Sequence, residues 1–251
     1  MTPLVLEGGQ VAGLFLVLVR CTGVVVTAPL FGHRGLPATV KAALSVGLAV
    51  ALAPAAAVAP GATPALLAAP LELMIGLTMG FLLSLGFHAM EIAGRLISLQ
   101  LGLSLDAVFN PATDANQATV LDPLFAVLTG IVYLALDLHV EAVRVLGGSF
   151  RAFPIGGAWP LDLWLLVGRL VVLALDLGTR IAFPIALVLL LVELFVGLVA
   201  RAIPQINVFI LGLPAKLLIG LGVLAIAMPT LTGGAARLFR SVFSAVAAAG
   251  S

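Results

Sequence analysis

Long apolar runs constrain this chain more than any other feature of its sequence. Val46–Ala59 and Leu73–His88 contain no Asp, Glu, Lys or Arg. Only 9% of the 251 residues are charged and the mean hydropathy is +1.26, whereas a soluble domain carries about 25% charged residues. So few charges cannot cover the core of a water-soluble protein of this size.

The runs are continuous, and this favours helices over the other architecture that lipid permits. A closed β-barrel also satisfies its backbone hydrogen bonds in a membrane. Its strands would read as segments of about ten residues with alternating polarity. The chain is therefore predicted to be a polytopic all-α membrane protein, as one domain or two tightly packed halves.

Six hydrophobic segments follow one another along the chain. Their expected ranges are Val11–Leu30, Ala38–Ala59, Leu71–Ile92, Pro123–Leu138, Leu161–Ala200 and Val208–Met228. We group them in a single domain, residues 1–251. It holds N-terminal helical hairpins (11–92), an amphipathic segment with a polar loop (94–122), C-terminal helical hairpins (123–230) and an amphipathic tail (231–251).

Only the first three segments are expected to be ordinary bilayer spans. In the fourth, the uninterrupted apolar stretch Leu124–Leu136 is shorter than the roughly 20 residues that a spanning helix needs. The last two segments carry charges at Arg169, Asp176, Arg180, Glu193 and Lys216. Each Arg, Lys or Asp near a helix centre costs about 2.5–3.5 kcal/mol on insertion. We therefore expect proteins, rather than lipid, around these helices.

Two oppositely charged pairs stand at i,i+4 and are predicted to meet on one helix face: Glu91 with Arg95, and Asp176 with Arg180. The positive-inside rule gives no orientation, since basic residues are shared evenly between the two sets of loops. The GxxxG formed by Gly76 and Gly80 is a weak helix-packing signal in a chain with 27 glycines.

Signatures of catalysis are absent from the sequence. Its three histidines are far apart, no HExxH, GxSxG or GxxxxGK[ST] occurs, and the basic residues are scattered singly. We therefore predict no enzyme activity, cofactor, metal site or nucleic-acid partner. The lone Cys21 excludes an intrachain disulfide and is expected to be a small core residue.

Four stretches together resemble a known family. They are RCTGVVVTAPLFGHRGLPATVKAAL (20–44), GRLISLQLGLSLDAVFNPAT (94–113), HVEAVRVLGGSFRAFPIGG (139–157) and RAIPQINVFILGLPAK (201–216). In this order and at these intervals the chain resembles the FliR family of flagellar export proteins, which includes the SctT subunit of virulence type III secretion. The intact FGHRGLP and FPIGG favour the flagellar branch.

The resemblance implies a hetero-oligomeric export gate of kinked helical hairpins. FliP-like and FliQ-like subunits would join this chain, with FlhB-like and FlhA-like proteins beside and below them. The gate would sit in the bacterial inner membrane, within the flagellar basal body, in contact with lipid. Much of it would be raised above the membrane plane, which would account for the short, charged segments.

Family members also contribute a loop that helps to plug the closed pore, and the matching region is Ser104–Thr119. Its polar and helix-breaking residues suit a movable stopper, with one aromatic residue as a wedge. They are Asp106, Phe109, Asn110, Pro111, Asp114 and Asn116. The alternative is an ordinary solvated connector.

A further set of polar residues is expected to contact other subunits. These are Arg20, Glu91, Arg95, Asp176, Arg180, Glu193, Arg201, Gln205 and Asn207. Arg20 lies inside an apolar segment, so it needs a partner, which the sequence does not identify. Arg201, Gln205 and Asn207 flank Pro204 and suit either a contact with a FliQ-like subunit or simple helix-turn architecture.

These features together predict a passive conduit for unfolded proteins that draws its driving energy from elsewhere, since no nucleotide site is present. The alternatives are a virulence-type SctT gate subunit and a secondary transporter for a small solute. In the transporter, Asp176, Arg180 and Glu193 would form the coupling site.

Overall fold

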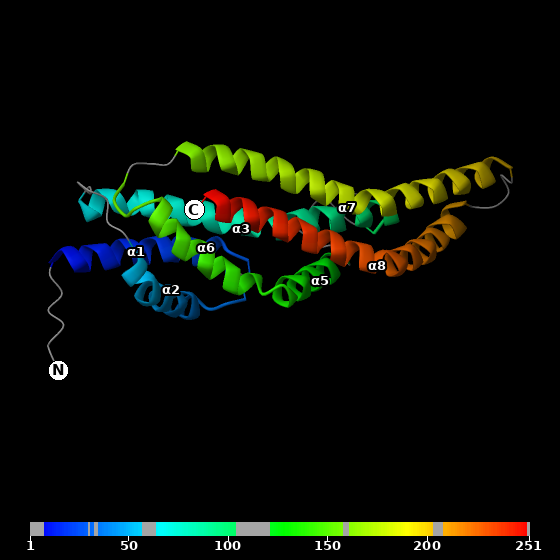
Figure 1. Ribbon diagram of the computed structural model, residues 1–251. Coiled ribbons are helices and arrows are strands. Elements are labelled where there is room, and N and C mark those ends of the chain that lie inside the picture. Colours follow the sequence, from blue (N-terminus) through cyan, green and yellow to red (C-terminus); the bar gives the residue numbers. More distant parts are fainter. Residues whose placement is uncertain are drawn as a thin grey trace. The chain divides into compact units, whose positions relative to one another are not determined.

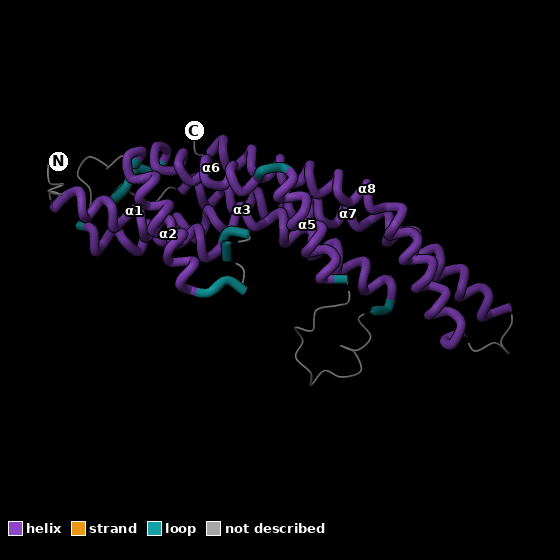
Figure 2. Tube along the Cα trace, turned by 90° about the horizontal axis from the view of Figure 1, so that it is seen from below, coloured by secondary structure: helices purple, strands orange, loops and turns teal. Residues whose placement is uncertain are grey.

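A computed structural model of the chain describes residues 8–29, 31–32, 35–56, 64–103, 121–157, 161–202 and 208–249. Every regular element in these ranges is a helix (Figure 2). The helices are α1 (Gly8–Thr27), α2 (Ala38–Leu52), the short 3₁₀ helix η1 (Ala53–Ala55), α3 (Ala65–Leu101), α5 (Asp122–Ala135), α6 (Leu138–Ala152), α7 (Leu161–Ala202) and α8 (Val208–Ala249), as labelled in Figure 1. The all-α class predicted from the apolar runs is confirmed.

The helices form two compact units. Unit 1 comprises Met1–Leu85, Asp137–Val172 and Phe239–Ser251, and unit 2 comprises Gly86–Leu136 and Leu173–Leu238. The three longest helices, α3, α7 and α8, each contribute residues to both units. Each unit is therefore assembled from segments that are distant in the sequence.

In unit 1, α1 packs against α2, and α6 and the N-terminal part of α3 complete the core. Its fully buried residues include Val17, Cys21, Leu82, Phe150 and Phe239. Cys21 is thus the core residue that we expected. α6 follows Asp137, whose positive φ of 52° turns the chain, and it carries Glu141 in its first turn and Arg151 in its last. These charges complement the helix dipole.

In unit 2, the C-terminal part of α3 packs with α5, α7 and α8. Small residues allow the close approach: a Cβ on Gly178 would lie 2.7 Å from the carbonyl oxygen of Ala89, and one on Gly94 would lie 2.8 Å from the Phe125 ring. α5 begins with Pro123 in its first turn, where the missing N–H is not needed. The buried Tyr133 of α5 lies with its ring centroid 5.3 Å from that of Phe87.

Helices are longer than the sequence predicted. The segment expected at 71–92 and the start of the amphipathic segment at 94 belong to the single helix α3, which passes through Pro70. α7 is continuous through Pro184, and the sixth segment and the tail form one helix, α8, through Pro214 and Pro229. Packing along these helices offsets the roughly 3 kcal/mol that an internal proline costs.

Of the first three segments, which were expected to be ordinary spans, the third lies in a helix long enough to cross a membrane, whereas the first two form the shorter apolar helices Val11–Thr27 and Ala38–Leu52. Among the described residues, three helices are long and apolar enough to cross a membrane: Leu66–Leu101, Trp164–Val199 and Pro214–Ala248. α2 has only 15 residues, which is about 22 Å at 1.5 Å per residue. The ability of α7 and α8 to span a membrane was not predicted, because both helices contain charged residues. Each helix nevertheless has enough apolar residues around those charges to cross a bilayer.

Candidate functional site

A buried arginine organises the interior of unit 1. Arg20 of α1 has a fully buried side chain, and each arm of its guanidinium has a partner. Nε donates to Glu72 Oε2 at 2.6 Å, Nη1 to the Ser149 carbonyl oxygen at 3.1 Å, and Nη2 to the Phe153 carbonyl oxygen at 2.8 Å. The guanidinium carbon also lies 4.6 Å from the centre of the Phe150 ring. One cation thus joins α1, α3 and α6.

Glu72 of α3 extends the cluster to the turn that follows α6. Its side chain is 2% exposed, and its second oxygen, Oε1, accepts a hydrogen bond of 3.0 Å from the Gly156 amide. Gly156 has a φ of 74°, in the left-handed region that favours glycine. The turn at 153–157 is therefore held at two points, by Arg20 at the Phe153 carbonyl and by Glu72 at the Gly156 amide. We call Arg20, Glu72, Ser149, Phe150, Phe153 and Gly156 the arginine cluster.

The α1–α3 crossing brings Arg20 and Glu72 together. Gly76, one turn after Glu72, faces the Arg20 carbonyl oxygen so closely that a Cβ would collide with it. A Cβ on Gly23 would lie 2.8 Å from the carbonyl oxygen of Leu73. The Thr27 hydroxyl donates to the Leu77 carbonyl oxygen at 3.2 Å across the same crossing. The GxxxG that was a weak signal in the sequence thus lies at a true helix crossing.

This arrangement is suited to holding structure rather than to reacting. A buried ion pair must recover its desolvation cost through geometry and further hydrogen bonds. Here the guanidinium has four acceptor atoms, one of them the Ser149 hydroxyl oxygen, and the carboxylate has two donors, all from this chain. In the described part of the chain, no three His, Cys, Asp or Glu residues lie together as a metal site requires. The cluster positions three helices and a turn.

Comparison with known proteins gives this arrangement a context. The model of the bacterial export proteins, family 1, matches residues 11–242. The chain belongs to this family. It is 31% identical to the flagellar biosynthetic protein FliR of Escherichia coli (strain K12), over 92% of this chain and 89% of the relative. The FliR of Pectobacterium carotovorum subsp. carotovorum is also 31% identical, over 94% and 92%, and that of Bacillus subtilis (strain 168) is 28% identical, over 91% and 89%.

The resemblance to the FliR family is therefore confirmed, and two of the four stretches that carried it meet in the arginine cluster. Arg20 opens the first stretch, and Phe153–Gly157 closes the third. Arg20 was expected to contact another subunit. Its partner is Glu72 of this chain, so the reason given for an inter-subunit contact does not apply to Arg20.

Glu72, Ser149 and Phe150 were missed. Glu72 could have been found, because Arg20 requires a counter-charge and Glu72 is one of few acids inside an apolar run. Phe153 contributes only its backbone carbonyl oxygen to Arg20, and Ser149 accepts through its carbonyl oxygen at 3.1 Å and more weakly through its hydroxyl at 3.5 Å. No residue type marks such a role, so nothing in the sequence predicts it.

Five of the other predicted polar residues form ion pairs within unit 2. Arg95 donates to Glu91 on α3, and Arg180 Nε lies 2.8 Å from Asp176 Oδ2 on α7, so both i,i+4 predictions are confirmed. Glu193 of α7 pairs with Lys216 of α8 at 3.3 Å, which was not predicted. These charges are mostly exposed: the side chains of Arg180 and Glu193 are 73% and 62% exposed. Their contacts with other subunits stay a prediction.

Of the remaining predicted residues, only Arg201 lies in the part of the chain that the structure describes. Arg201 is exposed near the C-terminal end of α7. Gln205 and Asn207 lie outside the described residues, as does the whole set predicted for the plug loop. That set is Asp106, Phe109, Asn110, Pro111, Asp114 and Asn116.

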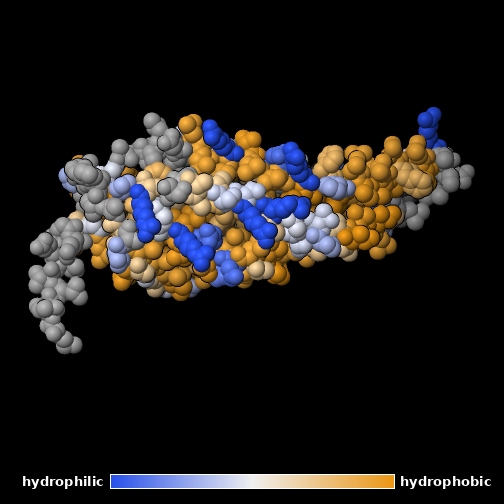
Figure 3. All heavy atoms as spheres, in the orientation of Figure 1, coloured by the Kyte–Doolittle hydropathy of each residue, from blue (hydrophilic) through white to orange (hydrophobic). Residues whose placement is uncertain are grey.

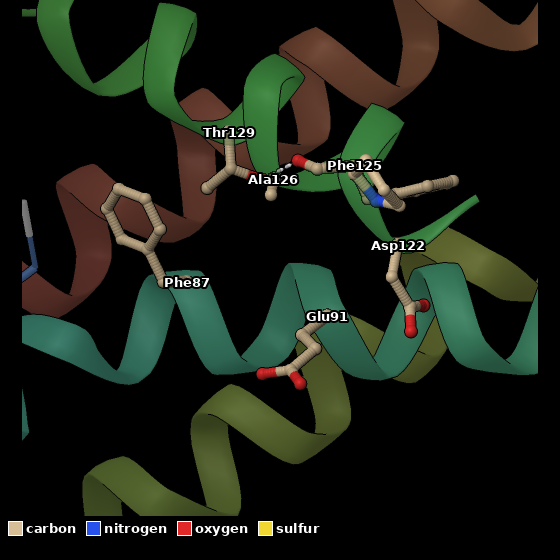
Figure 4. A pocket seen from close by; sticks show the side chains of 7 residues that line it. Phe87, Glu91, Asp122, Phe125, Ala126 and Thr129 are labelled. Atoms are coloured by element: carbon tan, nitrogen blue, oxygen red, sulfur yellow. Dashed lines mark hydrogen bonds between the residues drawn. The ribbon is translucent and has the colours of Figure 1, made fainter. Parts of the chain in front are cut away.

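A cavity of about 330 Å³ opens between α3 and α5 in unit 2 (Figure 4). Phe87 and Phe125 form apolar walls, and Glu91 and Asp122 lie beside them. In the close-up, the Glu91 carboxylate points away from the Phe87 ring. Because Glu91 is paired with Arg95 on its own helix, the cavity presents mainly apolar surface.

Proposed function

We propose that this chain is a non-enzymatic core subunit of the flagellar type III export gate in the bacterial inner membrane. It would form part of the channel through which unfolded flagellar proteins pass. The main support is the family match over residues 11–242, together with relatives named flagellar biosynthetic protein FliR. The long apolar helices support a membrane site. Driving energy would come from other parts of the apparatus.

The exposed surface of α5 is evidence that this chain binds partner subunits. This helix has 14 residues, about 21 Å at 1.5 Å per residue, so it is too short to span a bilayer. Its buried face holds Phe125, Thr129, Val132 and Tyr133. A stripe of exposed apolar residues runs along another face: Leu124, Val127, Ile131 and Leu134. Spacings of three, four and three residues match the seam by which one helix packs against another.

FliP-like and FliQ-like subunits are the proposed partners for this stripe, with FlhB-like and FlhA-like proteins at the periphery of the gate. The predicted inter-subunit polar residues Glu91 and Arg95 of unit 2 would lie at its other contacts. A narrow apolar seam on a short helix leaves lipid a poor occupant, because the helix could not reach both headgroup layers.

The α5 stripe provides the first test of assembly. Val127→Asp and Ile131→Asp place a charge in the seam and should remove the copurifying subunits while leaving the chain in the membrane. Val127→Ala is the matched control, since it shortens the same side chain without adding charge. In a strain that lacks this gene, the aspartate variants should also fail to restore motility. Retention of all partners in both aspartate variants would contradict the proposal.

We propose that the region 104–119 contributes to the pore plug, which rests on its composition and on the family resemblance. Deleting Ala107–Asn116 should let small ions leak through the assembled gate while subunit composition is unchanged. The measurement is ion conductance of membranes that contain the gate. Unchanged conductance in the deletion variant would count against the plug.

The rival transporter function predicts different behaviour. A transporter for a small solute should be stable alone or as a small homo-oligomer, whereas a gate subunit should copurify in a large hetero-oligomer. Within unit 2, Asp176 and Glu193 each have a cationic partner in this chain, Arg180 and Lys216. A virulence-type SctT gate would export a different cargo, so secretion of flagellar proteins in the complemented strain distinguishes the two.

A further inference from the structure

The α7–α8 hairpin of unit 2 exposes an unusually wide apolar surface. On α7, Leu187, Leu190, Leu191, Leu194, Phe195 and Leu198 are each between 47% and 66% exposed. At about 100° per residue, these side chains cover well over a quarter of the helix circumference. Only 17% of the apolar span of α7 and 22% of that of α8 are buried, against 44% for α3. In Figure 3, the end of this hairpin is almost entirely hydrophobic, with polar surface at its tip.

Few charged residues interrupt this surface. From Ile181 to Ala200, α7 carries one charged residue, Glu193, and from Val208 to Ala236, α8 carries one, Lys216. These two are paired with each other at 3.3 Å, and the Lys216 side chain is only 16% exposed. The opposite charges offset each other, although the Glu193 side chain is 62% exposed on the surface of the hairpin. Further positive charge lies outside the stretch, with the exposed Arg201 near the C-terminal end of α7.

The distance between the bounding charges matches one bilayer. Ile181–Ala200 is about 30 Å long at 1.5 Å per residue, which is the thickness of the hydrocarbon core. The two helices run antiparallel along this length. A Cβ on Gly220 would lie 3.0 Å from Leu189, and one on Gly234 would lie 2.9 Å from Ile181. The apolar band of α8 therefore covers the same stretch as that of α7.

We propose that the hairpin from Ile181 to Ala200, with the α8 residues packed on it, is the part of this chain that lies in the hydrocarbon core of a phospholipid bilayer. Arg201 lies in one headgroup layer, where its guanidinium meets lipid phosphate. The Asp176–Arg180 pair lies in the other layer. The whole of α7 is about twice as long as this band, so the rest of the helix extends beyond the lipid.

We assign lipid to the α7–α8 hairpin and a partner subunit to the α5 stripe because the two apolar surfaces differ in width and length. The α5 stripe is narrow and its helix is too short to span, which fits a partner helix. The hairpin band is broad, has the thickness of the hydrocarbon core and ends in exposed charge at both levels. This inference concerns the membrane boundary and does not depend on the export function.

The test measures the depth of spin labels. Leu191→Cys and Leu198→Cys are made in a Cys21→Ala background, labelled with a nitroxide and purified with their copurifying subunits. The sample is reconstituted into vesicles of phosphatidylethanolamine and phosphatidylglycerol. Collision rates are measured with oxygen, which partitions into hydrocarbon, and with a water-soluble nickel chelate. The ratio of oxygen to nickel collisions should be several-fold higher at position 191, mid-band, than at 198, near Arg201.

Leu175→Cys is the matched control. Leu175 is an exposed leucine of the same helix, at 47% against 55% for Leu191, but it lies beyond Asp176. Its label should meet the nickel chelate far more often than the label at 191. Low collision with both reagents at 191 would show that protein covers the band, and high nickel collision would show water there. Either result, or equal ratios at 175 and 191, overturns the proposal.

Discussion

Arg20 Nε lies 2.6 Å from Glu72 Oε2 in the interior of unit 1, and the two side chains are 0% and 2% exposed. The residues are separated by 52 positions in the sequence. Such a pair contributes little when compared with a well-packed apolar pair, but removing one partner leaves an uncompensated buried charge. The first prediction follows from this asymmetry.

Glu72→Ala should destabilise the chain by about 3–5 kcal/mol, the range observed when a buried ion pair loses one partner. The Gly156 amide would also lose its acceptor. The measurement is the midpoint of thermal unfolding of the purified protein in mild detergent. Glu141→Ala is the control, since Glu141 forms an exposed pair with Arg144 in the same unit and should cost less than about 1 kcal/mol. Equal effects of the two substitutions would contradict a structural role for the arginine cluster.

Gly76→Ala should also lower the unfolding midpoint, because the new methyl group would collide with the Arg20 backbone carbonyl oxygen. The helices would have to separate and lengthen the Arg20–Glu72 contact. Gly47→Ala is the matched change on α2, where a Cβ would meet nothing within 4 Å. It should raise stability by roughly 0.5–1 kcal/mol, the usual gain for alanine over glycine within a helix. An increase in stability for Gly76→Ala would show that the crossing is looser than described.

Gly156→Ala should destabilise unit 1 by about 1–2 kcal/mol, because φ at this position is 74° and an L side chain is strained there. The strain would act on the turn whose amide binds Glu72. Gly156→Asn tolerates the left-handed region better and should recover part of the loss. The same thermal measurement applies, and a larger loss for asparagine than for alanine would point to side-chain size instead of backbone strain.

Lys216→Met should reduce the amount of protein found in the membrane, because Glu193 would remain charged on an exposed apolar face. An unpaired charge at mid-helix costs about 2.5–3.5 kcal/mol on insertion. The double variant Glu193→Gln with Lys216→Met should restore the amount and, if the export function is correct, motility as well. Membrane fractions are quantified by immunoblot. A double variant that is abundant but inactive would instead favour a direct role for Glu193, as in a coupled transporter.

Sequence reasoning reached the class of the fold but not its internal geometry. The apolar runs were sufficient for an all-α membrane protein, because lipid permits few alternatives. The start of the third segment was misplaced after Pro70, where tertiary packing overrides local propensity. The need of Arg20 for a partner was predicted, since it follows from desolvation alone. The identity of Glu72 was not, because it depends on how α1 and α3 cross.

The division of the chain into units bears on the order in which it can be made. The last segment of unit 1 begins at Phe239, and the side chains of Phe239 and Val242 are fully buried. α1, which the ribosome synthesises first, belongs to the same unit. That unit is therefore complete only after nearly the entire polypeptide has been translated, whereas the hydrogen-bond partners of Arg20 are all present once Phe153 has been made. The charge of Arg20 can thus be compensated well before the rest of its unit exists.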